Sequence, residues 1–117
     1  MRHRRGNAKL GKPTDQRIAL LRSLVRELFI RDRIQTTKTR AKAAQQYADR
    51  IIALAKKGDL ASRRRAISLL PQKDVIKKVF DHVGPQVKER NGGFTRVVPL
   101  APRQGDAAPM ALLELVA

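Results

Sequence analysis

Positive charge constrains this sequence more than any other feature. Its 117 residues hold 26 lysines and arginines against 10 aspartates and glutamates, for a net charge of +16 at pH 7. Like charges at this density repel one another and destabilise a compact fold. A polyanionic partner would relieve that repulsion, so the charge balance favours a nucleic-acid-binding protein, with an anionic membrane surface as the main alternative.

The apolar content still suffices for one globular domain. Hydrophobic residues make up 42% of the chain, close to the share typical of folded domains. Aromatic residues contribute only 3%, so the core must rest on aliphatic side chains, and extensive base stacking on aromatic rings is excluded. The absence of cysteine excludes disulfides and thiolate metal sites. No apolar run reaches the roughly 20 residues of a membrane span, and no signal-peptide pattern follows the basic N-terminus.

Residues 1–13 differ in composition from the rest of the chain. They hold no acid, and Gly6, Gly11 and Pro13 interrupt any helix. We therefore expect an extended basic N-terminal arm over residues 1–13 and a single globular domain over residues 14–117. The arm would bind RNA, and the alternative is a frayed, solvated terminus.

Apolar residues recur at helical spacing at the start of the domain. This spacing predicts an amphipathic helix over residues 15–31, with Thr14 or Asp15 as its N-terminal cap. The short segment 34–37 is rich in β-branched residues and predicts a brief strand.

A second helix is predicted through Lys57, with Thr37 or Thr39 as its cap. Gly58 suits the left-handed position that ends a helix. The apolar side of this helix is unusually rich in alanine, which implies close packing against its neighbours. It consists of Ala41, Ala44, Ala48, Ile51, Ile52 and Ala55.

Two shorter helices are expected to follow. Asp59 would begin a third helix that Pro71 ends, and a fourth would cover residues 73–83 before Gly84-Pro85 stops it. The inward side chains of the third helix are expected to be Leu60, Ala66, Ile67 and Leu70. Three consecutive arginines, Arg63 to Arg65, span about 200° of helix surface, so at least one or two must face outward.

The C-terminal part has the pattern of a small sheet. Asn91-Gly92-Gly93 predicts a turn that needs positive φ. Residues 94–100 and 109–116 then alternate as strands do, and Pro99 marks a strand end or an edge. The predicted fold class is α+β: a helical middle of about four helices packed on a small three-stranded mixed sheet, with the extended basic arm.

No catalytic machinery is apparent in the sequence. The two histidines, His3 and His82, lack the partners that acid–base or metal chemistry needs, and no nucleotide-binding or hydrolase motif occurs. We expect a protein that is not an enzyme and that takes no metal, cofactor or small-molecule substrate.

The cationic residues are biased toward arginine, which numbers 16 of the 26. The planar guanidinium binds phosphate through two hydrogen bonds and also stacks on bases. The candidate RNA-binding residues are Arg2, His3, Arg4, Arg5, Lys9, Lys12, Arg17, Arg22, Arg26, Arg63, Arg64, Arg65, Arg96 and Arg103. Some of these could instead pair with surface aspartates. A helix-turn-helix DNA reader centred on Gly58-Asp59 is the other alternative, although the following helix offers few amides for reading adenine.

Several short segments recur, in this order, in one protein family. They are Met1-Arg2-His3-Arg4, Ile34-Gln35-Thr36-Thr37, Leu54-Ala55-Lys56, Arg63-Arg64, Gly92-Gly93-Phe94-Thr95-Arg96, Gly105-Asp106, Ala108-Pro109-Met110-Ala111 and Glu114-Leu115-Val116. The chain resembles the bacterial-type large-subunit ribosomal protein seventeen family over nearly its whole length. The C-terminal segments are the most specific part of the resemblance.

The resemblance implies a structural constituent of the large ribosomal subunit that binds its rRNA near the rim of the polypeptide exit tunnel. It also implies neighbouring large-subunit ribosomal proteins as partners, and a location on the ribosome in the cytoplasm, or in the stroma or matrix of an organelle. The RNA contacts that it implies are Arg2, His3, Arg4, Arg17, Arg22, Arg63, Arg64, Arg96 and Arg103. Arg65 extends the family's arginine pair to three.

Overall fold

The structure is a computed structural model and describes residues 13–116. The predicted arm therefore lies outside the described residues, apart from Pro13. The elements in chain order are α1 (Thr14–Arg31), β1 (Arg33–Thr37), α2 (Lys38–Lys57), α3 (Leu60–Leu69), α4 (Lys73–Lys78), the π-helical turn η1 (Val79–Val83), α5 (Gly84–Gln86), β2 (Thr95–Leu100) and β3 (Met110–Leu115). Because α4, η1 and α5 are continuous, the helices form four bodies, and the predicted α+β class is confirmed.

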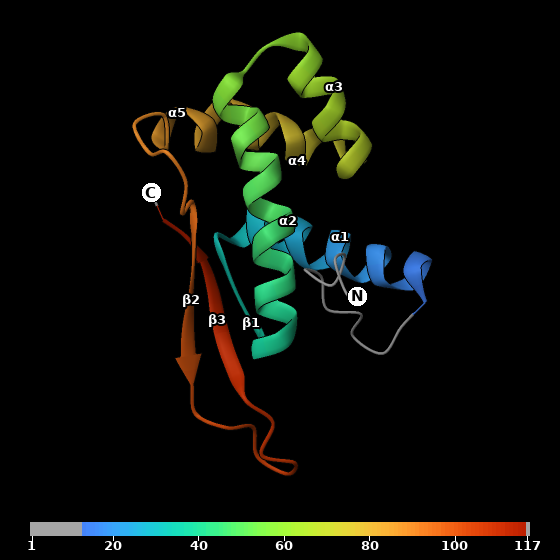
Figure 1. The fold of residues 1–117 in the computed structure, drawn as a ribbon, viewed down its shortest axis with the longest axis vertical. Coiled ribbons are helices and arrows are strands. Elements are labelled where there is room, and N and C mark those ends of the chain that lie inside the picture. Colours follow the sequence, from blue (N-terminus) through green and yellow to red (C-terminus); the bar gives the residue numbers. More distant parts are fainter. Residues whose placement is uncertain (1–12, 117) are drawn as a thin grey trace, which may run out of the picture.

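The helix α2 occupies the centre of the molecule and packs against all three strands of the sheet (Figure 1). The helix α1 crosses it, while α3 and the α4–η1–α5 body lie at its C-terminal end. The alanine side of α2 is fully buried as predicted. Small side chains there let the neighbouring elements approach closely, and the space is filled by large residues from those elements, notably Leu28 and Phe29 of α1.

The sheet is antiparallel throughout rather than mixed. Its strand order is β1-β3-β2, and both neighbouring pairs are antiparallel. The strands β1 and β2 run in the same direction, but β3 inserts between them, so no parallel pair forms (Figure 1). The loop over residues 101–109 is short enough to join β2 and β3 only as an antiparallel pair.

The boundaries of α2 follow its local signals. Thr37 is the N-cap, and its hydroxyl accepts a hydrogen bond from the backbone N–H of Arg40 at 3.4 Å. Gly58 ends the helix with φ +73°. For α1, by contrast, the predicted caps are wrong, because Pro13 occupies the cap position and no side chain caps the helix.

Two predictions about the shorter helices are also wrong. Leu60 is not inward but 63% exposed, because Ser62 and Ala66 form the buried side of α3 and Leu60 lies about 200° around the helix from Ser62. Gly84-Pro85 does not end the fourth helix, which continues to Gln86. Pro85 lies where the π-helical turn η1 passes into α5, so the helical body continues through a residue that has no N–H to donate.

Gly93 provides a test of the turn before β2. Its φ is +64°, and a Cβ built there would meet no atom within 4 Å. Gly93→Val should therefore destabilise the fold through backbone strain alone, by about 1–2 kcal/mol, as measured by urea unfolding. The adjacent Gly92 is equally open but is not left-handed, so Gly92→Val is the matched control. Equal stabilities of the two variants would refute the turn assignment.

Candidate nucleic-acid interface

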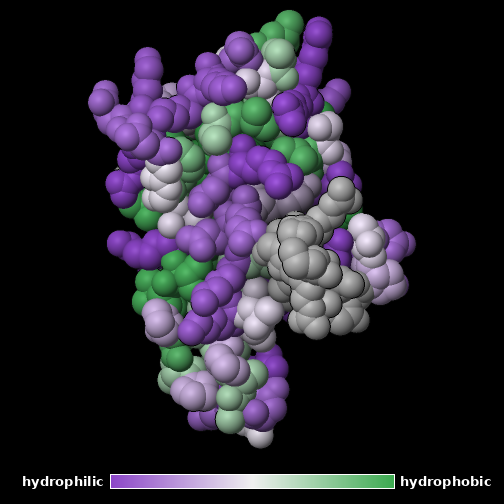
Figure 2. All heavy atoms as spheres, in the orientation of Figure 1, coloured by the Kyte–Doolittle hydropathy of each residue, from purple (hydrophilic) through white to green (hydrophobic). Residues whose placement is uncertain are grey.

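The outward side of α2 carries a row of exposed polar and cationic side chains. Lys38, Lys42, Gln46, Arg50 and Lys57 are all exposed, and most are spaced four residues apart, which places them on one side of the helix. In Figure 2, hydrophilic side chains form a band over the course of α2. We call these five residues the α2 row.

No carboxylate interrupts the α2 row. The one acid of α2, Asp49, turns toward the sheet, where its Oδ1 accepts a hydrogen bond from the Thr95 hydroxyl at 2.9 Å. The Gln45 side-chain amide donates to the Thr95 carbonyl at 3.2 Å. Burial raises the pKa of Asp49, and the hydrogen bond from Thr95 partly opposes that rise. The acid therefore serves the docking of α2 on β2, and the outward side of α2 stays cationic.

The three arginines of α3 divide into two roles. The Arg63 guanidinium lies over the Phe80 ring, 5.1 Å from its centroid, and is 3.6 Å from an Asp81 carboxylate oxygen. Arg64 and Arg65 are exposed and form no ion pair within residues 13–116. Two of the three arginines therefore face outward, which confirms the prediction that at least one or two would do so. The contacts of Arg63 make it a link between α3 and η1.

A cleft opens between α1, α2 and the end of α3. It encloses about 300 Å³ and brings together Arg17 and Arg22 of α1 with Arg50 of α2. The guanidinium of Arg22 is already engaged: its Nε donates to the Leu69 carbonyl at 2.9 Å and its Nη2 to the Ser68 carbonyl at 3.1 Å. Arg22 thus caps backbone carbonyls at the C-terminal end of α3, where a positive charge is favourable.

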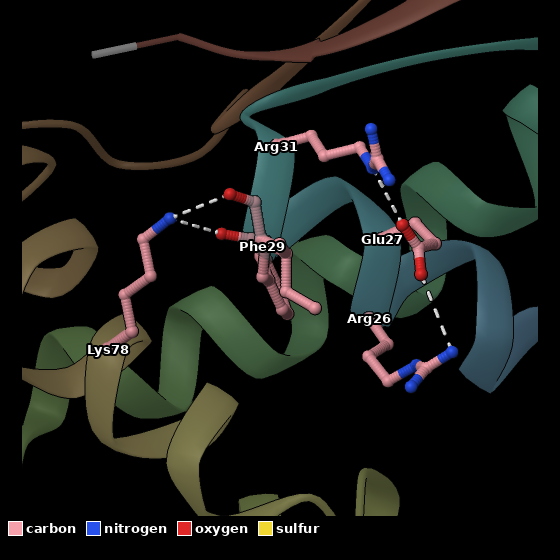
Figure 3. Close-up of polar contacts among 6 residues, drawn as sticks. Arg26, Glu27, Phe29, Arg31 and Lys78 are labelled. Atoms are coloured by element: carbon pink, nitrogen blue, oxygen red, sulfur yellow. Dashed lines mark hydrogen bonds and ion pairs between the residues drawn. The ribbon is translucent and has the colours of Figure 1, made fainter.

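The end of α1 holds a second group of paired charges (Figure 3). Glu27 lies between Arg26, at 3.4 Å, and Arg31, at 2.9 Å. Lys78 reaches over from α4 and donates to the carbonyls of Phe29 and Ile30 at 2.7 and 3.1 Å. These contacts engage Arg26 within the protein.

The two predicted RNA-binding arginines of the sheet region also form ion pairs. Arg96 lies opposite Glu114 in the β2–β3 register, with a contact of 2.5 Å. Arg103 binds both carboxylate oxygens of Asp106, at 3.1 and 2.6 Å. A phosphate bound at either arginine would compete with a carboxylate that is already in place.

The Arg103–Asp106 pair predicts a specific titration. The hydrogen bonds from Arg103 and from the Ala108 N–H hold the pKa of Asp106 at about 2, below the usual 3.8. Because the folded-state pKa is lowered, the contribution of the pair is present above pH 3.8 and is lost as pH falls through about 2. Arg103→Gln should raise this pKa toward 3.8, as followed by NMR of the Asp106 carboxyl carbon, whereas Arg96→Gln should not. An unchanged Asp106 titration in Arg103→Gln would contradict the pairing.

The structure thus groups some predicted residues and separates others. Arg17, Arg64 and Arg65 have no ion pair within the described part, whereas Arg22, Arg26, Arg63, Arg96 and Arg103 are engaged by other groups of the protein. The remaining candidates, Arg2, His3, Arg4, Arg5, Lys9 and Lys12, lie outside the described residues. The sequence analysis missed Lys38, Lys42, Arg50 and Lys57. Their spacing opposite the alanine side of α2 was the signal that could have identified them.

Residues 13–116 hold no cluster of three or more histidine, aspartate or glutamate side chains placed to ligate a metal ion. Within the same range, every helix is too short or too polar to cross a membrane.

Comparison of the sequence with known proteins identifies the family to which the chain belongs. Residues 20–116 match the family model described as "Ribosomal protein L17". The "Large ribosomal subunit protein bL17" of Caldanaerobacter subterraneus subsp. tengcongensis is 50% identical over 108 residues, which cover 92% of this chain and 96% of the relative. The protein of the same name from Clostridium acetobutylicum is 50% identical over 111 residues, 95% of this chain and 97% of the relative. That of Clostridium tetani is 48% identical, with 95% and 98% covered. This chain therefore belongs to the ribosomal protein L17 family, a family of structural ribosomal proteins and not of enzymes.

Proposed function

We propose that this protein binds and stabilises folded large-subunit rRNA through contacts between arginine or lysine and phosphate, as a structural component of the large ribosomal subunit. The observation that carries the proposal is a set of basic side chains that form no ion pair within residues 13–116, namely the lysines and the arginine of the α2 row, Arg17, Arg64 and Arg65. These residues come from the three helices α1, α2 and α3. The protein would be located on the ribosome, in the cytoplasm.

Phosphate neutralisation is the mechanism that this surface supports. Folded RNA brings phosphates close together, and fixed positive charges between them lower their mutual repulsion. Because the backbone of these helices is already folded, only the side chains lose conformational freedom when they bind phosphate. We include Arg2, His3, Arg4, Arg5, Lys9 and Lys12, which lie outside the described residues, among the proposed RNA contacts. Recognition through phosphate, ribose and shape is the usual mode for folded RNA.

The proposed partners also include neighbouring large-subunit ribosomal proteins, and the proposed location is the rim of the polypeptide exit tunnel. The resemblance to the family supports both. The sheet region offers a surface suited to protein contact, because Arg96 and Arg103 are neutralised there and Leu100 is exposed.

Sucrose-gradient sedimentation of cell lysate tests the proposal directly. The protein should migrate with the large subunit in a one-to-one ratio at moderate salt and should be released at high salt. Quantitative mass spectrometry of the fractions measures this ratio. Migration with DNA, or in the free pool at moderate salt, would refute the ribosomal assignment and favour the DNA-binding alternative.

A further inference from the structure

The cleft between α1, α2 and the end of α3 has features that phosphate neutralisation alone does not require. We propose that it holds a single unstacked ribonucleotide of the bound RNA, an inference that rests on the proposed function. A flat cationic surface would suffice for duplex phosphates. Here the surface is hollowed, to about 300 Å³, and its cationic rim encloses an apolar interior.

The rim offers two guanidinium groups for a phosphate. Arg17 comes from α1 and Arg50 from α2, and neither forms an ion pair within residues 13–116. Both line the cleft. Each guanidinium group presents a planar pair of donors to phosphate oxygens, which the ammonium group of a lysine does not.

The interior of the cleft is mostly apolar. Ile18, Leu21, Leu69 and the ring of Tyr47 line it, and all four are half-buried. The Tyr47 hydroxyl donates to the Leu69 carbonyl, which also accepts the hydrogen bond from Arg22. The polar atoms around Leu69 are therefore satisfied by one another, and the surface left to a ligand is hydrocarbon and aromatic ring. Such a surface suits the face of a base or the carbon side of a ribose.

Gln46 supplies a group able to read a base edge. Its side chain is exposed, lines the cleft beside Arg50, and makes no hydrogen bond within the described part of the chain. An amide both donates and accepts, as base edges do. The volume lies at the small end of the range for ligand pockets, which fits one nucleotide and excludes a stacked pair.

The test is an NMR titration of the full-length protein with each of the four ribonucleoside 5′-monophosphates, with inorganic phosphate as the reference ligand. At least one nucleotide should shift the Tyr47 ring and Gln46 side-chain signals and bind about tenfold more tightly than phosphate, because stacking adds to the ionic contact. Equal affinity for phosphate and for all four nucleotides would overturn the proposal, as would shifts confined to other surfaces.

Three variants and a control sharpen the result. Arg50→Gln should weaken both phosphate and nucleotide binding, whereas Ile18→Trp should fill the cleft and abolish only the nucleotide preference. Gln46→Ala, at an exposed position where substitutions usually change stability little, should reduce the preference among bases. Lys73→Gln removes an exposed charge from α4, outside both the cleft and the α2 row, and should leave the cleft signals unchanged. A nucleotide preference that survives both Ile18→Trp and Gln46→Ala would overturn the proposal.

Failure of this inference is distinguishable from failure of the proposed function. A protein that sediments with the large subunit but shows no nucleotide preference would refute the cleft alone. A protein that binds nucleotides in the cleft but does not sediment with the subunit would refute the ribosomal assignment and leave the cleft site standing.

Discussion

Raising the salt concentration from about 50 to about 200 mM should weaken binding of the purified protein to large-subunit rRNA by about a thousandfold or more. Each phosphate that a lysine or arginine neutralises releases condensed counterions, and six or more such contacts give a loss of this size. Only six of the described basic residues are in ion pairs with carboxylates, so the surface has cations enough for those contacts. Filter binding at several salt concentrations measures the slope of log affinity against log salt.

Two kinds of variant distinguish arginines that contact phosphate directly from arginines that are already in an ion pair within the protein. Arg64→Gln with Arg65→Gln removes two outward charges without an intramolecular partner, and should lower the magnitude of the salt slope by about 2. Arg96→Gln removes a charge that Glu114 already neutralises and should change the slope much less. A flat salt response of the unaltered protein would refute phosphate neutralisation, and equal slopes in the two variants would refute the distinction by pairing.

The helix α2 was predictable almost in full because all its determinants are local. The Thr37 cap, the left-handed Gly58 and the alanine spacing are read from neighbouring residues and need no knowledge of the tertiary fold. The same spacing places Lys42 and Arg50 on the opposite side. The sequence therefore contained the signal for these members of the surface, although they were not among the predicted RNA-binding residues.

The roles of the individual arginines were less predictable, because they depend on contacts between distant segments. Arg96 meets Glu114 only through the strand register, Arg63 meets Asp81 across two helices, and Arg22 binds carbonyls at the end of α3. A count of charges shows that most basic residues have no acidic residue to pair with, but it does not show which basic residues these are. Arg103–Asp106 is the exception, since a separation of three residues in a turn could have indicated that pair.

The sheet shows the same limit at the level of topology. Strand positions followed from alternation and turn residues, and all three strands begin within one residue of expectation. The order of the strands could not be predicted, because no local sequence signal reveals that β3 inserts between β1 and β2. The end of the fourth helix also depends on a long-range contact. Gly84 lies against Ala55 of α2, which is 29 positions earlier in the sequence.

Gly84→Ala should destabilise the fold by about 1–3 kcal/mol, the usual cost of overpacking a filled interior. A Cβ at this position would lie 2.8 Å from the Ala55 carbonyl oxygen and 3.3 Å from the Ala55 Cβ. Both positions are buried, and backbone atoms cannot swing aside as a flexible side chain would. Urea unfolding monitored by circular dichroism measures the change.

The direction of the change is the informative result, because helix propensity alone predicts the opposite. Alanine in place of a helical glycine usually stabilises by up to about 1 kcal/mol. The steric clash at Gly84 is expected to exceed that gain, since the π-helical turn and α5 could relieve it only by moving away from the end of α2 and opening the core around Val79 and Val83. Gly92→Ala, at an open position, controls for glycine replacement as such and should stay within about 0.5 kcal/mol. A more stable Gly84→Ala variant would show that α5 does not need its close approach to α2, and that glycine is dispensable at the contact.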